Sequence, residues 1–146
     1  YQPRLYVSGP HARELEVLNK TGLDFRVLGD RIGSASAIKM CYASLTKGLT
    51  ALATELLVTA EILGVSEALK AEFKLSQAEL YNLMEKGLPA MPSKSHRWVG
   101  EMEEIAATFE HIGLTPKILA GAADMYRFVE KTHLAASSSE HARDRR

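Results

Sequence analysis

The chain has 146 residues, no formal net charge at pH 7 and 46% hydrophobic side chains. This length and apolar content fit one compact domain, or one and a half small ones, with a substantial core. The neutral charge argues against a nucleic-acid surface built on a basic patch, and the single cysteine, Cys41, excludes a disulfide framework.

Other sequence features limit the location of the protein. The N-terminal residues lack the basic and then apolar pattern of a signal peptide, and the most apolar segment carries Lys47, Glu55 and Glu61. We therefore expect neither secretion nor a membrane span, and a reducing, cytoplasmic compartment is the default. In that setting Cys41 is interpreted as a small buried hydrophobic residue.

Two short β-rich segments flank a helical one near the N-terminus. Residues 5–7 and 25–28 favour strands, residues 11–20 between them have helical spacing, and Gly22 is a plausible C-terminal cap. Strand, helix and strand in so short a stretch form a βαβ unit, whose two strands run parallel. Because two strands alone do not make a stable sheet, we expect them to dock on strands outside this chain or on another subunit.

From Gly33 onward the sequence predicts only helices. The first covers residues 34–63, about 45 Å at 1.5 Å per residue, and ends at Gly64. Its apolar side chains cover most of its circumference, which is typical of the central helix of an all-α domain or of a dimer interface. Later helices are predicted over residues 67–73, 77–86, 96–112 and 117–132. The first, second and fourth of them follow start signals, which are Ser66, Ser76 and Thr115 with Pro116.

The most distinctive motif joins the second strand to the long helix. Gly33 is followed by small residues, from Ser34 to Ala37, and Lys39 lies one turn inside the helix. Small residues allow a cofactor to come close to a helix start, and a desolvated lysine there can take or give a proton. The alternative interpretation is an ordinary solvated lysine in a first helical turn.

The remaining polar residues give weaker signals. The histidines lack the spacing of metal ligands, so no metal site is expected. Lys94, His96 and Arg97 form a small basic group that meets either a substrate carboxylate or phosphate, or only solvent. The acidic run that begins at Glu101 is interpreted as a solvated helix face.

The segment from Arg4 to Lys39 resembles the join between the two domains of β-hydroxyacid dehydrogenases and 6-phosphogluconate dehydrogenases. In that superfamily, the last βαβ unit of the nucleotide-binding domain leads through a Gly-x-Gly turn into a long helix with a catalytic lysine. Here Gly33 precedes Lys39 by six residues, Met40 follows directly, and Gly48 comes nine residues later. Residues 34–48 and 97–106 look closest to a branch that pairs an NAD(P)-binding domain with a phosphogluconate-dehydrogenase-like C-terminal domain.

The resemblance implies a mainly α fold. Residues 1–31 would form the tail of a Rossmann-type nucleotide-binding domain and residues 32–134 an all-α, 6-phosphogluconate-dehydrogenase C-terminal-like domain. Residues 135–146, rich in serine and charge, are predicted to be a disordered tail. The resemblance further implies a homodimer packed through the long helix.

The same resemblance assigns roles to side chains at the start of that helix. Lys39 would be catalytic, and Gly33 and Ser34 would face an NAD or NADP cofactor held by the nucleotide-binding half. Ser36 and Thr46 would bind a small-molecule substrate, because helical spacing puts them on the same face as Lys39.

Several positions depart from the pattern of the superfamily. Ala43 replaces an asparagine, Thr46 replaces the glutamate of the phosphogluconate enzymes, and Ala35 replaces the second glycine of the turn. Glu101 stands where a cofactor-facing lysine is usual, and no Gly-x-Gly-x-x-Gly turn follows a strand. Two functions follow: the substrate-side and dimerisation half of an NAD(P)-dependent oxidoreductase, or a non-catalytic helical oligomerisation module left after loss of the nucleotide-binding half.

Overall fold

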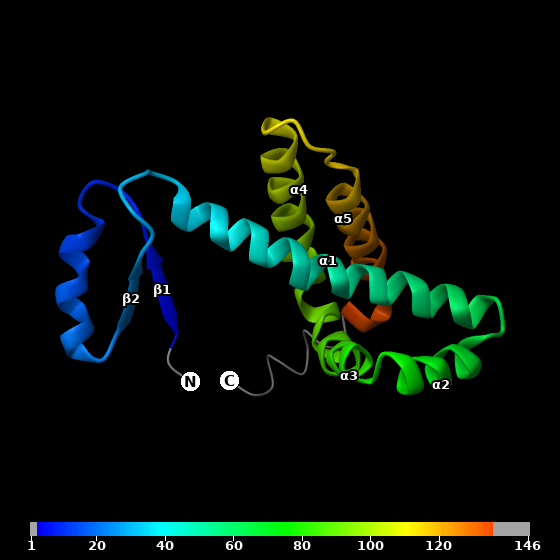
Figure 1. Cartoon of the computed structure of the whole chain (residues 1–146). Helices are drawn as coiled ribbons and strands as arrows, with labels where there is room; N and C mark the ends of the chain where they lie inside the picture. The colour runs from blue at the N-terminus through cyan, green and yellow to red at the C-terminus, as the bar shows by residue number, and fades with distance from the viewer. Residues whose placement is uncertain (1–2, 136–146) are drawn as a thin grey trace. The chain divides into compact units, whose positions relative to one another are not determined.

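The computed structural model describes residues 3–135, which divide into two compact units, one ending at Ala43 and the other beginning at Ser44 (Figure 1). The long helix α1, Ser34–Ile62, contributes residues to both units. Of the predicted tail, only Ala135 is among the described residues, so the prediction of disorder at 136–146 lies outside them. No described helix has the length and apolarity needed to cross a bilayer.

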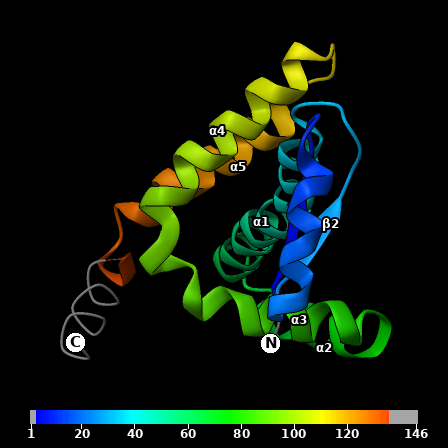
Figure 2. The same cartoon turned by 90° about the vertical axis from the view of Figure 1, so that its left-hand side faces the viewer.

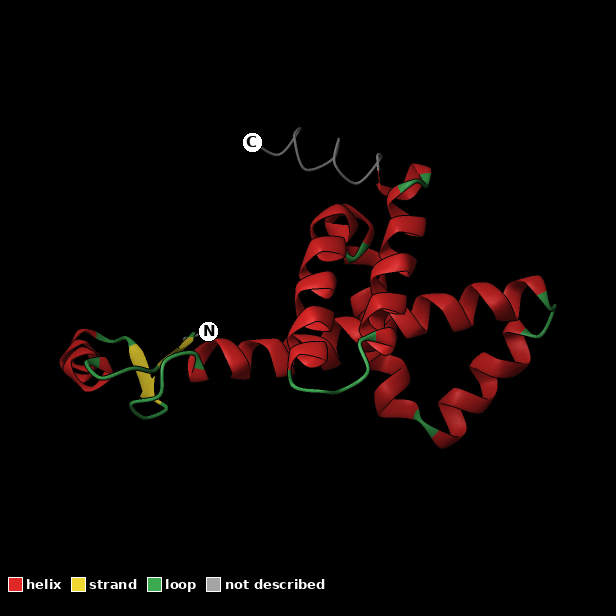
Figure 3. Ribbon diagram, turned by 90° about the horizontal axis from the view of Figure 1, so that it is seen from above, coloured by secondary structure: helices red, strands yellow, loops and turns green. Residues whose placement is uncertain are grey.

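The first unit contains two parallel strands, as the sequence predicts. Strand β1, Arg4–Val7, pairs with β2, Asp24–Val27, and within the described residues the sheet has these two strands alone (Figure 3). The side-chain amide of Asn19 adds to the pairing of β2. It accepts a hydrogen bond from the N–H of Phe25 at 2.7 Å and donates one to the carbonyl of the same residue at 3.2 Å.

The segment that connects the strands is a 3₁₀ helix, η1, Ala12–Thr21, which ends at Gly22. The helical prediction is confirmed, but the tight 3₁₀ geometry over ten residues is not visible in the spacing. Ala12 is its one buried residue. Tertiary packing supplies most of the stability of an α-helix. Because η1 buries so little, that stabilisation is missing here.

The core of the second unit lies mainly between two helices. Helix α4, Ser95–His111, packs along α5, Lys117–Glu130, and both views show them side by side (Figures 1 and 2). The shorter helices of this unit are α2, Ser66–Ser76, α3, Ala78–Gly87, and the 3₁₀ turns η2, Leu88–Ala90, and η3, Pro92–Lys94. The most deeply buried side chains include Met102, Ile105, Ala123 and Tyr126.

Helix α1 packs in the second unit through its small residues. Its buried residues are three alanines, Ala51, Ala53 and Ala60, and a Cβ added at Gly48 would lie 3.9 Å from Leu119. Several of its larger apolar side chains are exposed instead, among them Tyr42, Leu45, Leu52 and Ile62. Cys41 is also exposed, which corrects its interpretation as a buried residue, because it shares the outer part of the helix with these side chains.

The end of α1 follows the prediction, whereas two predicted caps are wrong. Gly64 takes φ +71°, a conformation that favours glycine, and the N–H of Val65 returns to the carbonyl of Ala60 at 2.9 Å. Ser66 begins α2 without capping it, and the hydroxyl of Ser76 donates to Glu72 at 2.9 Å inside the same helix. Such backward bonds compete with capping, so a serine near a helix end is an ambiguous signal.

Candidate functional site

The start of α1 is built on a glycine turn. Gly33 has φ +92°, a conformation that side chains other than glycine rarely adopt, and its carbonyl accepts a hydrogen bond from Ala37 at 2.8 Å. A Cβ at Gly33 would meet no atom within 4 Å among the described residues. The turn therefore needs glycine for its backbone, and it leaves open space at the beginning of the helix.

Ser8 ties this helix start to the first strand. It follows β1 directly, and its hydroxyl oxygen accepts a hydrogen bond from the N–H of Ala35 at 3.1 Å. The contact satisfies one of the backbone donors that a helix N-terminus leaves open. Sequence reasoning missed Ser8, although a serine at the carboxyl end of a strand is a common capping signal.

The predicted substrate-side residues are all accessible. Ser36 and Lys39 are exposed, Ser34 is half-buried, and Thr46 is exposed further along α1. Within the described part of the chain, no ion pair or hydrogen bond engages the Lys39 ammonium group. The structure thus places these residues where helical spacing predicts, and their roles stay predictions.

A second group of chemically active side chains surrounds Trp98 in α4. The Lys47 Nζ lies 5.6 Å from the centre of the indole ring, and the Lys94 Nζ lies 5.9 Å from it. Both distances are within the range of cation–π attraction. The ring of Tyr126 meets the indole edge-on, with centroids 5.3 Å apart.

Glu101 joins two cations of this group. Its carboxylate forms an ion pair with Lys47 across α1 and α4, and its Oε1 lies 3.1 Å from the Nε of Arg97 one turn earlier. The side chain of Lys47 is 19% exposed and that of Glu101 is 33% exposed. The interpretation of Glu101 as part of a solvated face is therefore wrong, because its carboxylate is half-buried and paired with Lys47 of α1.

Tyr126 completes the connection between α1 and α5. Its buried hydroxyl donates a hydrogen bond to the backbone carbonyl of Lys47 at 2.6 Å. Burial raises the pKa of the Tyr126 phenol, because removal from water disfavours the charged phenolate. The helices α1, α4 and α5 are thus connected by the side chains of Lys47, Trp98, Glu101 and Tyr126.

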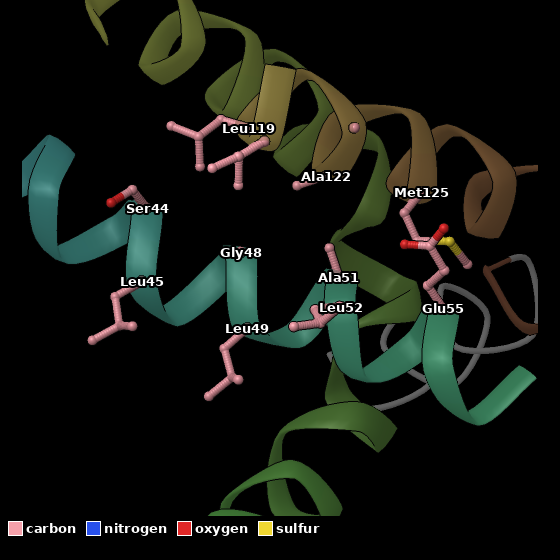
Figure 4. Close-up of a pocket in the computed structure, with 12 residues that line it drawn as sticks. Ser44, Leu45, Gly48, Leu49, Ala51, Leu52, Glu55, Leu119, Ala122 and Met125 are labelled. Carbon is pink, nitrogen blue, oxygen red and sulfur yellow. The ribbon is translucent and has the colours of Figure 1, made fainter. Parts of the chain in front are cut away.

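An apolar groove of about 330 Å³ runs between α1 and α5 (Figure 4). Ser44 and Glu55 supply its polar side chains. The apolar lining includes Leu45, Leu49, Leu52, Leu119, Ala122 and Met125. Such a lining favours an apolar side chain over a charged substrate. The described residues contain no group of three or more potential metal ligands.

Comparison with known proteins gives matches of unknown function. Residues 60–129 match a family model described as a domain of unknown function, DUF1932. An uncharacterized 28.5 kDa protein from the 7S RNA 5′ region of Methanothermus fervidus is 26% identical over 129 residues, which are 88% of this chain and 51% of that protein.

Two solved structures have the same fold. The conserved protein MTH1747, of unknown function, matches with a TM-score of 0.72 and 28% identity over 88% of this chain and 51% of its own. Its structure was described as similar to 3-hydroxyacid dehydrogenases. A conserved hypothetical protein from Sinorhizobium meliloti 1021 matches with a TM-score of 0.75 and 30% identity, over 84% of this chain and 42% of its own.

The chain spans about half the length of the relatives it matches. The similarity to the solved structures extends over more than four-fifths of this chain. The mainly α fold predicted from the sequence is confirmed. These matches support the superfamily of β-hydroxyacid and 6-phosphogluconate dehydrogenases, and the chain is similar to a C-terminal domain of that superfamily.

Proposed function

We propose that this chain is the substrate-side part of an NAD(P)-dependent oxidoreductase of the β-hydroxyacid dehydrogenase type. The observation that carries the proposal is the start of α1, where a glycine turn leaves open space and Lys39 is exposed one turn later. The similarity to MTH1747 supports the same conclusion, because the structure of that protein was described as similar to 3-hydroxyacid dehydrogenases.

The residues at this helix start fit the wall of a cofactor site better than its phosphate cradle. The N–H of Ala35 is already bonded to Ser8, and within the described residues no Gly-x-Gly-x-x-Gly turn follows a strand. We therefore assign the binding of the dinucleotide phosphates to a part of the protein outside this chain. NAD or NADP, when bound there, would supply the hydride acceptor.

Lys39 handles the proton in this proposal. As a neutral amine, its Nζ takes the hydroxyl proton of the substrate while the carbon loses hydride, and as an ammonium it returns that proton in the reverse reaction. Ser36, one turn earlier, offers a hydroxyl to the same substrate, and Thr46 offers another further along the face. The departures at Ala43 and Thr46 separate this site from that of 6-phosphogluconate dehydrogenases.

The proposal is tested by Lys39→Ala in the full-length protein. General acid–base catalysis contributes about 10²- to 10⁴-fold, so turnover should fall by that factor while the Kd for NADH or NADPH stays unchanged. Lys86→Ala, at the exposed end of α3, is the matched control and should keep full activity. Unchanged turnover in Lys39→Ala would exclude Lys39 as the proton carrier.

A second candidate function is favoured by a different observation. Large apolar side chains of α1 are exposed beside the groove between α1 and α5. We propose that this face packs against a second copy of the chain, which would make the protein a homodimer. A homodimer without turnover in the full-length protein would favour the non-catalytic oligomerisation module.

A further inference from the structure

We propose that the side chains around Trp98 form a binding site for a carboxylate or phosphate group of a small molecule. The site comprises the indole of Trp98 with the cations Lys47, Lys94 and Arg97. That the anion belongs to a substrate rests on the proposed function, whereas the binding itself does not.

The charges of the cluster do not balance. Three cations gather within one turn of Trp98 or over its ring, and among residues 3–135 Glu101 is the one carboxylate that forms a salt bridge with them. These three cations and one carboxylate leave an excess of two positive charges. Arg97 is 63% exposed and Lys94 is exposed, so an anion from solvent can reach both.

The position of these cations in the helix adds to the same field. Lys94, His96 and Arg97 stand at the start of α4, where the helix dipole is positive and acidic residues are the stabilising choice. The first turn of α4 contains no acidic residue, and the side chain of its N-cap residue, Lys94, makes no capping hydrogen bond. The hydroxyl of Ser95 donates to the carbonyl of Pro92 at 2.7 Å. A helix start that carries cations in place of stabilising acidic residues is expected where a functional site is located.

The indole supplies a further donor. The Nε1 of Trp98 is buried and has no hydrogen-bond partner among the described residues. An indole nitrogen only donates, and a buried donor without an acceptor is unfavourable. An oxyanion drawn to Lys94 and Arg97 would bring an acceptor oxygen to this region.

Glu101 indicates which kind of chemical group the cluster binds. Its carboxylate is already held by two of the cations, Lys47 and Arg97, so a carboxylate or phosphate from solvent would use the same kind of contact. Glu101 is then an internal competitor of the ligand, and its removal should increase the affinity for an external anion.

Trp98 is the single tryptophan of the chain, so its indole N–H gives one signal in a ¹H–¹⁵N spectrum. We would titrate the full chain separately with inorganic phosphate and with malonate, and with sodium chloride at matched ionic strength. At least one oxyanion should shift the indole signal to saturation, and the more effective one defines the ligand class. Chloride should leave the signal unchanged.

Two variants and one control assign the effect to the cluster. Lys94→Gln should weaken oxyanion binding about tenfold, and Glu101→Gln should strengthen it. Lys74→Gln is the matched control, because Lys74 lies 6.0 Å from the ring of Tyr81 in the same kind of contact elsewhere. Absence of saturation with both oxyanions, or equal affinities in Lys94→Gln and Lys74→Gln, would overturn the proposal. Neither result bears on Lys39, since no cofactor or turnover is involved.

Discussion

The hydroxyl of Tyr126 is a single polar group that links two helices of the core. Tyr126→Phe removes its hydrogen bond to Lys47 and keeps the aromatic contact with Trp98, so we expect a loss of about 1 kcal/mol in the free energy of unfolding. Tyr42→Phe makes the same change on a ring that is 71% exposed and serves as the control, because water can take the place of any contact that an exposed hydroxyl makes. Urea denaturation measures both, and equal effects would contradict the role of the buried hydroxyl.

The same residue predicts a pH dependence. Burial raises the pKa of the Tyr126 phenol in the folded state, while in the unfolded chain the phenol ionises at about pH 10. The phenol therefore favours the folded state below about pH 10, and this contribution is lost as the pH rises further. The stability difference between wild type and Tyr126→Phe should shrink by up to about 1.4 kcal/mol per pH unit above that point. A difference that stays constant from about pH 9 to about pH 11 would contradict the prediction.

Among the elements, α1 depends on small side chains for close packing. Ala53 is fully buried, so Ala53→Leu must displace neighbouring atoms, and we expect a destabilisation of about 1–3 kcal/mol. Ala37→Leu makes the same change at an exposed position of the same helix and controls for helix propensity. Thermal or urea unfolding compares the two variants. A similar stability of both would show that α1 does not pack as described.

The elements also show what sequence could and could not predict. The length of α1 follows from apolar spacing and from Gly64, and the parallel strand pair follows from the short βαβ pattern. The cluster around Trp98 was not predictable, because Lys47 and Glu101 lie 54 residues apart and periodicity identifies a face without its neighbour. The prediction that Cys41 is buried is wrong for the same reason. A wide apolar stripe on a helix does not show which part of the stripe packs against other elements.

For the whole molecule, the resemblance predicts the superfamily and the mainly α fold better than it predicts chemistry. The Gly33-to-Lys39 segment carries part of this resemblance, and the structure confirms a turn that favours glycine followed by a long helix. Ala43 and Thr46 differ from the superfamily pattern, so the resemblance does not predict the substrate. Fold and site chemistry are separable in this way, because one fold supports many activities.

The exposed apolar face of α1 and α5 gives the last prediction, which concerns assembly. Leu45, Leu52 and Ile118 are 68%, 56% and 75% exposed beside the groove, and burying apolar surface stabilises by about 25 cal/mol per Å². We expect the chain to sediment as a dimer at micromolar concentration. Leu52→Glu should shift it to monomer, because a carboxylate in an apolar interface loses its hydration without a partner.

Leu75→Glu is the matched control for this experiment. Leu75 is 84% exposed on α2, away from the groove between α1 and α5, so the same substitution there should leave the dimer intact. Analytical ultracentrifugation over a range of concentrations distinguishes the outcomes. A monomeric wild type, or dissociation by both substitutions alike, would show that this face is not the dimer interface. A selective effect of Leu52→Glu would instead assign the exposed apolar side chains of α1 to contact with a second copy.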